Sequence, residues 1–438
     1  MRRSVEKKLA VWKESKYRKP LILRGARQVG KTYTISQFGN TSFDSFVCFD
    51  FEQEKKLHCI FESDLHPDKM IMQLESHAEQ RIVPGKTLVF FDEIQACPRA
   101  LASLRYFYEQ CPKLHLIAAG SLLEFALGEI SFPVGRVEFE WMYPLSFVEF
   151  LEACDRNILK QHIPNLGSDE PVAPSIHEAI LEQLRYYFLV GGMPEAVRRF
   201  VETASIHEVS LVHSALIQSY QQDFLKYGTR VNSTTLERLM EQIPRQTGMQ
   251  IKYSRLDPDL RIDKIKDAIQ VLERALVIHR VHACAAQGLP LGAAVSDKIF
   301  KFVFLDIGLM QHLCGINAAE VLGTKDLMDS YRGALAEQFV GQELLCNITT
   351  PDNRRLYYWS RAQKNSNAEI DYLLVCNGST YAIEVKIGPT GKLRSLQVFL
   401  GEHPHCQGVV CSTQNIQNAS SIEKIRFLPL YTVLNSTS

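Results

Sequence analysis

A stretch near the amino terminus has the residue types and spacing needed to bind a phosphate chain. The run LILRGARQVGKT carries the pattern G-x-x-x-x-G-K-T from Gly25 to Thr32. Its glycines allow a tight turn whose backbone N–H groups point at phosphate oxygens, Lys31 can reach the β- and γ-phosphates, and the Thr32 hydroxyl can bind Mg²⁺. An apolar run precedes the pattern and a helix-period stretch follows it, so we expect ATP to bind here. The residues expected at this site are Gly25, Ala26, Arg27, Gln28, Val29, Gly30, Lys31, Thr32, Tyr33 and Asp92.

Two later apolar runs end in polar residues that could act on a bound nucleotide. TLVFFDE ends in Asp92 and Glu93, and HLIAAGS ends in Ser121. The carboxyl ends of parallel strands line the ligand crevice of an α/β sheet. Asp92 would then hold Mg²⁺, and Glu93 would orient and deprotonate the attacking water. Ser121 would sense the γ-phosphate, or it would only cap the helix that follows.

Transfer of a phosphoryl group also requires positive charge near the γ-phosphate. Arg24, Arg27 and Arg136 are the arginines that the sequence offers. Arg136 follows the Ser121 run, and a loop could carry it to its own site or to that of a neighbouring subunit. Each of the three could equally be a surface arginine.

A hairpin near the carboxyl terminus brings acidic residues face to face. In EIDYLLVCNGSTYAIEVKI, Asn377–Gly378 is the favoured dipeptide for a two-residue type I′ turn. This turn places Cys376 opposite Ser379 and, counting outward, Asp371 opposite Glu384. Directly opposed side chains have Cβ atoms about 4.5–5.5 Å apart. Two carboxylates at that separation repel each other unless a cation lies between them.

Strand alternation adds a lysine to the same face of the hairpin. Lys386 lies on the side of Glu384, with Glu369 expected opposite it, whereas the isoleucines and valine of the second strand take the other side. Asp371, Glu384 and Lys386 therefore form either a metal site or a solvated polar face.

The runs before residue 150 predict the element that positions the nucleotide residues. Short apolar segments rich in β-formers alternate with helix-period segments, which is typical of a parallel α/β sheet. Residues 176–228 read as helices around the turn GGMPEAV. A helix over LERLMEQI, a stronger helix over 262–278 and strands in HRVHAC and KIFKFVFLDIGL then follow the order of a winged helix. The outward face of the 262–278 helix offers Lys264, Lys266, Asp267, Gln270 and Arg274, which leaves DNA contact or packing against another domain open.

Composition excludes several classes of protein. The chain has 438 residues, 46% of them apolar, and a formal net charge of zero, which is ordinary for a globular protein and excludes a disordered or fibrous one. Zero net charge means that any binding to DNA must come from a local patch. We find no 18-residue apolar stretch and no signal peptide, and the 11 cysteines show no zinc spacing. We therefore expect a cytoplasmic protein that does not enter a membrane.

Motifs along nearly the whole chain resemble a single family. They are RGARQVGKT, LVFFDEIQ, AAGS, GR at 135–136, PLSFVEFL (144–151), GGMPEAV (191–197), KYSRLDPDLR (252–261), LPLGAAVSDKIFKFVFLDIGL (289–309), RGALAEQFVGQELL and EIDYLL…IEVK. These motifs look like those of the AAA-type ATPases that carry a C-terminal domain of unknown function. The resemblance implies a P-loop ATPase core over 1–150, a helical region over 151–230, a winged helix over 231–325 and a small α/β restriction-endonuclease-like domain over 326–438.

The carboxyl-terminal hairpin also resembles the PD-(D/E)xK nucleases. In that arrangement Asp371 and Glu384 would hold Mg²⁺ or Mn²⁺, Lys386 would position a hydroxide, and Glu337 would match the acidic helix position. The sequence lacks the proline that the motif places before Asp371. We expect an ATP-hydrolysing protein whose nucleotide state is coupled to the C-terminal domain, with DNA and a second copy of the chain as further partners. The alternatives are an ATP-regulated DNA nuclease and a nucleotide-switched interaction protein without nuclease activity.

Overall fold

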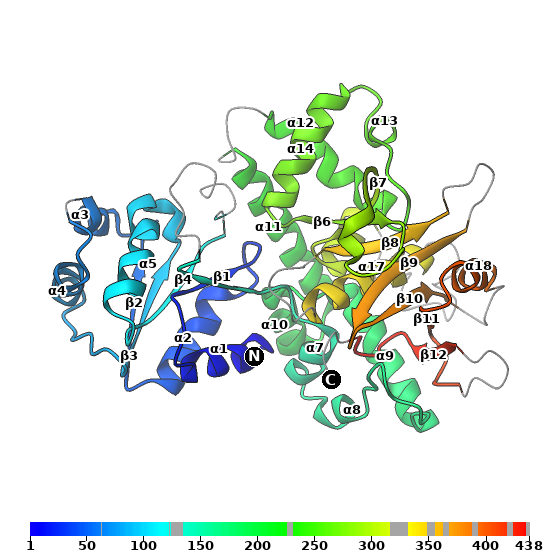
Figure 1. Ribbon diagram of the computed structural model, residues 1–438, viewed down its shortest axis with the longest axis horizontal. Helices are drawn as coiled ribbons and strands as arrows, with labels where there is room; N and C mark the ends of the chain where they lie inside the picture. The colour runs from blue at the N-terminus through cyan, green and yellow to red at the C-terminus, as the bar shows by residue number, and fades with distance from the viewer. Residues whose placement is uncertain are drawn as a thin grey trace. The chain divides into compact units, whose positions relative to one another are not determined.

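The amino-terminal runs form the parallel sheet that their alternation predicts. The computed structural model describes residues 1–62, 64–121, 123, 135–225, 231–315, 332–347, 355–361, 368–387, 393–417 and 424–434. Its chain divides into two units (Figure 1). The first comprises Met1–Tyr143 and Arg274–Leu276, and the second comprises Pro144–Glu273 and Val277–Ser438.

The first unit is built on a five-stranded, wholly parallel sheet. Its strands are β1 (Leu21–Arg24), β2 (Ser45–Asp50), β3 (Thr87–Asp92), β4 (His115–Ala119) and β5 (Glu138–Trp141). Their order is β2-β3-β4-β1-β5, so the strand order reverses beside β1, where a ligand crevice is expected. The predicted α/β core is thereby confirmed. The edge strand β5 is not predicted, because its glutamates and half-buried residues lack the apolar run of an inner strand.

Helices and a phenylalanine cluster complete this unit. The helical segments are α1 (Val5–Glu14), α2 (Lys31–Ser42), η1 (Lys55–Leu57), α3 (His58–Glu62), α4 (Pro67–Ala78), η2 (Ile94–Ala96) and α5 (Pro98–Gln110). Every residue of β3 and β4 is buried. The ring of Phe91 meets the rings of Phe51, Phe61 and Phe107 edge to face at 5.3, 5.8 and 6.1 Å. This packing fixes the end of β3, where the acidic pair begins.

The second unit contains a seven-stranded mixed sheet. Its strands are β6 (Ile278–Cys284), β7 (Val295–Phe304), β8 (Leu356–Ser360), β9 (Glu369–Cys376), β10 (Ser379–Val385), β11 (Gln407–Ser412) and β12 (Ile425–Pro429). They follow the order β12-β11-β10-β9-β8-β6-β7. The β6–β7 hairpin, expected as the wing of a winged helix, joins this sheet because β6 pairs in parallel with β8 (Figure 1).

Helices precede and interrupt that sheet along the chain. They are α7 (Phe147–Ala153), α8 (Asn157–Gln161), α9 (Pro174–Val190), α10 (Pro194–Thr203), α11 (Ile206–Phe224), α12 (Ser233–Gln242), η3 (Pro244–Gln246), α13 (Tyr253–Leu256), α14 (Ile262–Arg274), η4 (Leu291–Ala294), α15 (Ile307–Leu313), α17 (Arg332–Asn347) and α18 (Arg394–Glu402). The prediction that the strand continues through LDIGL is wrong, because β7 ends at Phe304. The buried Asp306 accepts a hydrogen bond from Leu309 N at 3.0 Å and starts α15 there.

The hairpin register is as the turn predicts. Cys376 pairs with Ser379 and Tyr372 with Ile383, which makes Asp371 and Glu384 the next opposed pair. Both turn residues have positive φ, 49° at Asn377 and 76° at Gly378, as a type I′ turn requires. Within the described residues, no helix combines the length and the apolar character needed to span a membrane.

Candidate functional site

The phosphate loop joins β1 to α2 in the first unit. Gly30 has φ 93° and caps α2, so the positive end of the helix dipole faces the loop. Lys31 is buried under the loop, and its Nζ donates to Gly25 O at 2.9 Å and to Ala26 O at 2.8 Å. Burial lowers the pKa of Lys31 to about 8, against the opposing effect of Glu93. A Cβ at Gly25 would lie 2.3 Å from Met142 O, so this turn requires glycine.

Thr32 and Asp92 bring two oxygen ligands together beside the loop. The Thr32 hydroxyl donates to Asp92 Oδ2 at 2.6 Å, across the space between α2 and the end of β3. Burial raises the pKa of Asp92, and the Thr32 hydroxyl acts in the opposite direction. A hydroxyl and a carboxylate are the donors that Mg²⁺ takes from proteins when nucleotide phosphates supply the rest. The pair therefore fits the ion that the sequence implies.

Three donors converge on one carboxylate oxygen of Glu93. Its Oε2 accepts from Gln95 Nε2 at 2.6 Å, from the Ser121 hydroxyl at 3.2 Å and from Ser121 N at 3.3 Å. Glu93 itself has φ 45°, a conformation that costs energy in a non-glycine residue and is commonest at functional sites. The structure thus brings the predicted Glu93 and Ser121 into contact. Gln95 has no role in the sequence interpretation, although it stands in the same LVFFDEIQ segment.

A buried arginine that sequence reasoning missed donates a hydrogen bond to the phosphate loop. Arg3 lies just before α1, and its Nη1 donates to Val29 O at 2.9 Å. Its Nη2 donates to Tyr143 O at 2.5 Å. This guanidinium therefore links the phosphate loop to the end of the first unit. Only its position in the fold, and no motif, distinguishes it from the other basic residues of the amino terminus.

The predicted arginines occupy different places. Arg24 packs over the rings of Phe139 and Trp141, at 3.8 and 5.4 Å from the ring centres. Arg27 is half-buried within the loop.

Arg136 lies before β5 and binds Glu109 Oε1 through its Nε at 2.9 Å. Glu138 pairs with Leu21, the first residue of β1, so Arg136 lies at the amino-terminal ends of the strands. The phosphate loop lies at their carboxyl-terminal ends. The predicted role of Arg136 at a γ-phosphate stays a prediction.

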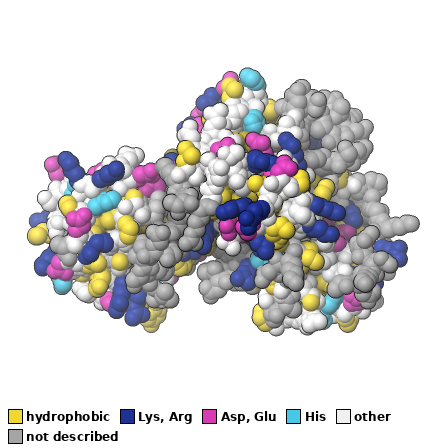
Figure 2. All heavy atoms as spheres, turned by 90° about the horizontal axis from the view of Figure 1, so that it is seen from above, with side chains coloured by type: hydrophobic (Ala, Val, Ile, Leu, Met, Phe, Trp, Pro, Cys, Tyr) yellow, Lys and Arg dark blue, Asp and Glu magenta, His cyan; other side chains and the backbone are white. Residues whose placement is uncertain are grey.

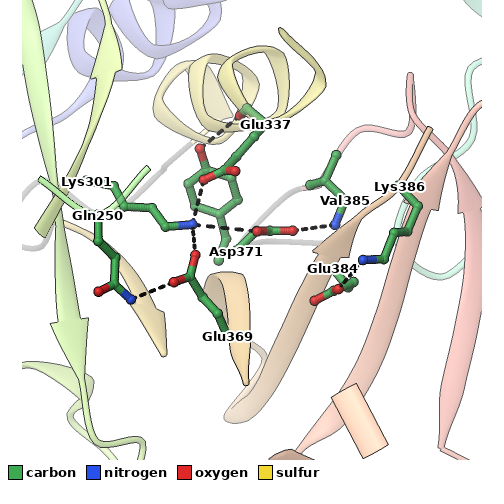
Figure 3. Close-up of polar contacts among 9 residues, drawn as sticks. Gln250, Lys301, Glu337, Glu369, Asp371, Glu384, Val385 and Lys386 are labelled. Atoms are coloured by element: carbon green, nitrogen blue, oxygen red, sulfur yellow. Dashed lines mark hydrogen bonds and ion pairs between the residues drawn. The ribbon is translucent and has the colours of Figure 1, made fainter. Parts of the chain in front are cut away.

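The carboxyl-terminal acidic residues form a cluster around a lysine (Figure 3). Lys301 of β7 is 1% exposed, and its Nζ lies 2.8 Å from Glu337 Oε1 and 3.6 Å from Asp371 Oδ1. It also binds Glu369 Oε1. Glu369, expected opposite Lys386, thus pairs with Lys301 and with Gln250 Nε2, the latter at 2.6 Å.

Glu384 and Lys386 form a separate ion pair at 2.6 Å. Burial, followed by the charge of Asp371, raises the pKa of Glu337 to about 8 and that of Glu384 to about 7.

These residues do not fit the predicted metal site. Glu337, Asp371 and Glu384 were expected to share a divalent ion, but Glu337 and Asp371 are held by an ammonium group. In the described part of the chain, no three His, Cys, Asp or Glu side chains are grouped so as to hold a metal ion. Sequence reasoning missed Lys301. Its signal is a lysine within the apolar run IFKFVF, since buried lysines require charged partners.

Several family motifs outside the two sites pack together within the second unit. Gly192 N donates to Asp306 Oδ2 at 2.6 Å, and Leu145 N donates to Gly192 O at 2.6 Å. A Cβ at Gly192 would lie 2.1 Å from Leu145 O. The segment GGMPEAV therefore contacts PLSFVEFL through backbone and FLDIGL through the Asp306 side chain, and the close approach of Leu145 O explains the glycine at 192.

The exposed face of α14 carries both signs of charge. Lys264, Lys266, Asp267 and Gln270 are exposed, whereas the apolar positions between them are buried. Lys266 lies over the ring of Tyr253 at 5.3 Å. Basic and acidic side chains are likewise interspersed on the face that Figure 2 shows. DNA binding by this helix stays a prediction.

The comparisons with known proteins divide the chain into three parts. Residues 17–151 match the family described as "AAA domain". Residues 181–320 and 332–432 match two families described as domains of unknown function, DUF8612 and DUF4143. No curated protein matches the chain.

Several solved structures are similar at low identity. The RuvB Holliday junction branch migration motor of Thermotoga maritima is 15% identical, with 67% of this chain and 91% of that chain covered and a TM-score of 0.29. A STAND protein with a tetratricopeptide repeat sensor from Pyrococcus horikoshii is 11% identical, with 78% and 45% covered and a TM-score of 0.27. A Drosophila ORC structure is 13% identical, with 71% and 85% covered and a TM-score of 0.27. The family match and the parallel sheet agree: residues 17–151 are similar to AAA domains and have the fold of a P-loop NTPase.

Proposed function

We propose that this protein binds ATP and hydrolyses it with Mg²⁺ at the loop between β1 and α2. The observation that carries the proposal is the carboxylate of Glu93, which Gln95 and Ser121 hold in place next to the Thr32–Asp92 pair. A base fixed in this way beside a phosphate loop is the arrangement that activates a water molecule.

Each residue of the site has a distinct task in this reaction. The loop N–H groups and Lys31 bind the β- and γ-phosphates, and Thr32 and Asp92 hold the metal ion. When bound, Mg²⁺ neutralises phosphate charge and orients the phosphate chain. Glu93 orients the attacking water and accepts its proton, and Ser121 keeps the Glu93 carboxylate in position while sensing the γ-phosphate.

The remaining positive charge would come from a neighbouring copy of the chain. Arg136 is 46% exposed in its side chain and stands opposite its own phosphate loop, as an arginine supplied to another subunit would. We therefore propose that the chain works as a homo-oligomer.

We also propose that hydrolysis is coupled to the second unit as a nucleotide-controlled interaction module. The ion pair between Lys301 and Asp371 favours this function over an ATP-regulated nuclease, because it engages one of the two carboxylates with which a nuclease would hold a metal ion. Its target, DNA or protein, would be bound rather than cut.

The test is steady-state ATP hydrolysis by the full chain with Mg²⁺ or EDTA, and with or without single- and double-stranded DNA. We expect Mg²⁺-dependent turnover that Lys31→Ala abolishes, because the variant lacks the cation aimed at the β- and γ-phosphates. Lys86→Ala, an exposed lysine of the same unit, serves as the matched control and should keep the wild-type rate. Equal rates for Lys31→Ala and wild type would refute the ATPase proposal.

A further inference from the structure

The lysine at the centre of the carboxylate cluster is the most completely buried cation of the second unit's described ion pairs. Lys301 lies between Phe300 and Phe302 on β7, with a side chain that is 1% exposed. An ammonium removed from water in this way costs several kcal/mol unless charged partners surround it. Glu337 of α17 and Glu369 and Asp371 of β9 supply those partners (Figure 3).

Both carboxylate oxygens of Asp371 and of Glu369 already have a partner. Asp371 directs Oδ1 at Lys301 and accepts Val385 N on Oδ2 at 2.8 Å. Glu369 uses Oε1 for Lys301 and Oε2 for Gln250. A divalent ion binding here would have to displace donors that the protein itself provides. The two positive charges of that ion would also repel the ammonium of Lys301, which is covalently part of β7.

The neighbouring carboxylates favour the charged form of Lys301. Burial alone would lower the pKa of Lys301, but Glu337, Asp371 and Glu369 together raise it above its ordinary value. These three carboxylates therefore favour the protonated, charged form of Lys301. Lys301 also precedes α17 in the chain, whereas Glu337 lies within α17 and Glu369 and Asp371 follow it, so the ion pairs join stretches that are distant in sequence.

We propose that Lys301 is the resident cation of Glu337, Glu369 and Asp371, that these three carboxylates bind this ammonium in preference to a divalent metal ion, and that the cluster is a structural ion network. The proposal does not depend on ATP hydrolysis by the first unit. It accounts for the acidic hairpin face without a metal, and it makes the nuclease alternative the outcome that would overturn it.

The test uses the full chain without nucleotide, with Mn²⁺ as the probe. Bound Mn²⁺ is counted by electron paramagnetic resonance, and the unfolding temperature is measured in EDTA and in millimolar Mn²⁺. We expect the wild type to bind the same number of Mn²⁺ ions as Asp371→Asn. We also expect the unfolding temperature of the wild-type second unit to be the same with and without metal. Asp371→Asn should lower that temperature equally in both conditions, because it deletes a partner of Lys301.

Variants at Lys301 sharpen the result. Lys301→Met leaves Glu337, Glu369 and Asp371 without their cation, so we expect it to unfold at a lower temperature in EDTA and to recover stability with Mn²⁺. Adding Asp371→Asn to Lys301→Met should remove that recovery. Lys301→Arg keeps the charge and should gain no Mn²⁺ site.

Two results would overturn the proposal even if Lys301→Met fails to fold. The first is a wild-type Mn²⁺ site that Asp371→Asn abolishes. The second is an Asp371→Asn variant that is neutral or stabilised in EDTA, since that is the effect of relieving repulsion between unpaired carboxylates. Failure of the ATPase proposal would alter neither measurement, because ATP turnover is assayed separately.

Discussion

At the residue scale, the chemistry of the first unit centres on one oxygen atom of Glu93. Gln95 and Ser121 both donate to Oε2, which fixes the orientation of the carboxylate. The other carboxylate oxygen is then the one that would face the water. A base held by two partners loses little orientational freedom when the nucleotide binds, which lowers the entropic cost of the reaction.

The first prediction concerns this carboxylate. Glu93→Gln keeps the shape of the side chain but cannot accept a proton from water, so ATP should still bind while hydrolysis slows by about 10²–10⁴-fold. Single-turnover hydrolysis and nucleotide titration measure the two effects separately. A variant that hydrolyses at the wild-type rate would place the base elsewhere, and one that no longer binds ATP would indicate a structural role for Glu93.

Sequence reasoning reached the residues of the first unit that sit in local motifs and missed those that act at a distance. Glu93 and Ser121 follow apolar runs, and their meeting follows from parallel strands sharing one edge. Arg3 and Lys301 touch their partners 26 and 36 or more residues away, so their contacts depend on tertiary structure. A lone charged residue carries no periodic signal that would reveal such a partner.

At the element scale, α17 links segments of the second unit through polar side chains. Gln338 accepts from Phe304 N and donates to Phe304 O, both at 2.8 Å. Gln342 accepts from Ile307 N at 2.9 Å, and Glu343 accepts from Phe147 N at 2.8 Å. Their bonds satisfy backbone groups at the end of β7 and at the starts of α15 and α7, which would otherwise be buried without these partners.

The second prediction concerns the pH dependence of that helix. Burial raises the pKa of Glu343 to about 8 from an ordinary value near 4.5, so the folded state holds its proton more tightly than the unfolded state. The resulting stability is fully present below pH 4.5 and is lost as the pH rises towards 8, by about 1.4 kcal/mol for each pKa unit. Glu343→Gln removes this titration but keeps an oxygen for Phe147 N.

Thermal unfolding between pH 5 and pH 9 measures the difference between the two proteins. We expect Glu343→Gln to gain stability relative to the wild type as the pH rises. The comparison cancels the contributions of Glu337 and Glu384, which titrate in both proteins. Parallel curves for the two proteins would show that Glu343 is not the titrating group.

The element scale also separates what the sequence predicts from what packing decides. The register of β9 and β10 follows from the Asn377–Gly378 turn, because a two-residue turn fixes every pair in the ladder. The end of β7, in contrast, cannot be predicted from the local sequence. FLDIGL is apolar enough for a strand, and only the cap at Asp306 starts a helix there. The seven-stranded sheet joins β6 to β8 across more than 70 residues, a pairing that no local pattern specifies.

At the scale of the whole molecule, the nucleotide loop and Arg136 of the first unit lie at opposite ends of the strands of one sheet. Arg136 precedes β5 by two residues, and its partner Glu109 lies near the end of α5, which also reaches that edge. A single copy therefore offers a phosphate site on one edge and an exposed guanidinium on the other. Head-to-tail association of identical units would bring the two together, which is the geometry of a ring or filament.

The third prediction tests this arrangement by mixing two inactive variants. Arg136→Ala should bind ATP but lose hydrolysis, because an arginine supplied to the γ-phosphate is worth about 10³–10⁵-fold in rate. Glu93→Gln should be slow for the reason given above. If Arg136 serves a neighbour, an equal mixture of the two variants places wild-type Glu93 beside wild-type Arg136 at about a quarter of the interfaces, and activity should return to about that fraction.

Glu109→Gln provides the control for this experiment, because it weakens the surface pair of Arg136 while leaving the guanidinium in place. Exposed pairs contribute little to stability, so this variant should fold and should keep its hydrolysis rate. A mixture that stays inactive would exclude a role for Arg136 in a neighbouring site. Because its place at the amino edge already separates Arg136 from its own phosphate loop, the inactive mixture would leave Arg24 and Arg27 as the arginines able to act on the γ-phosphate.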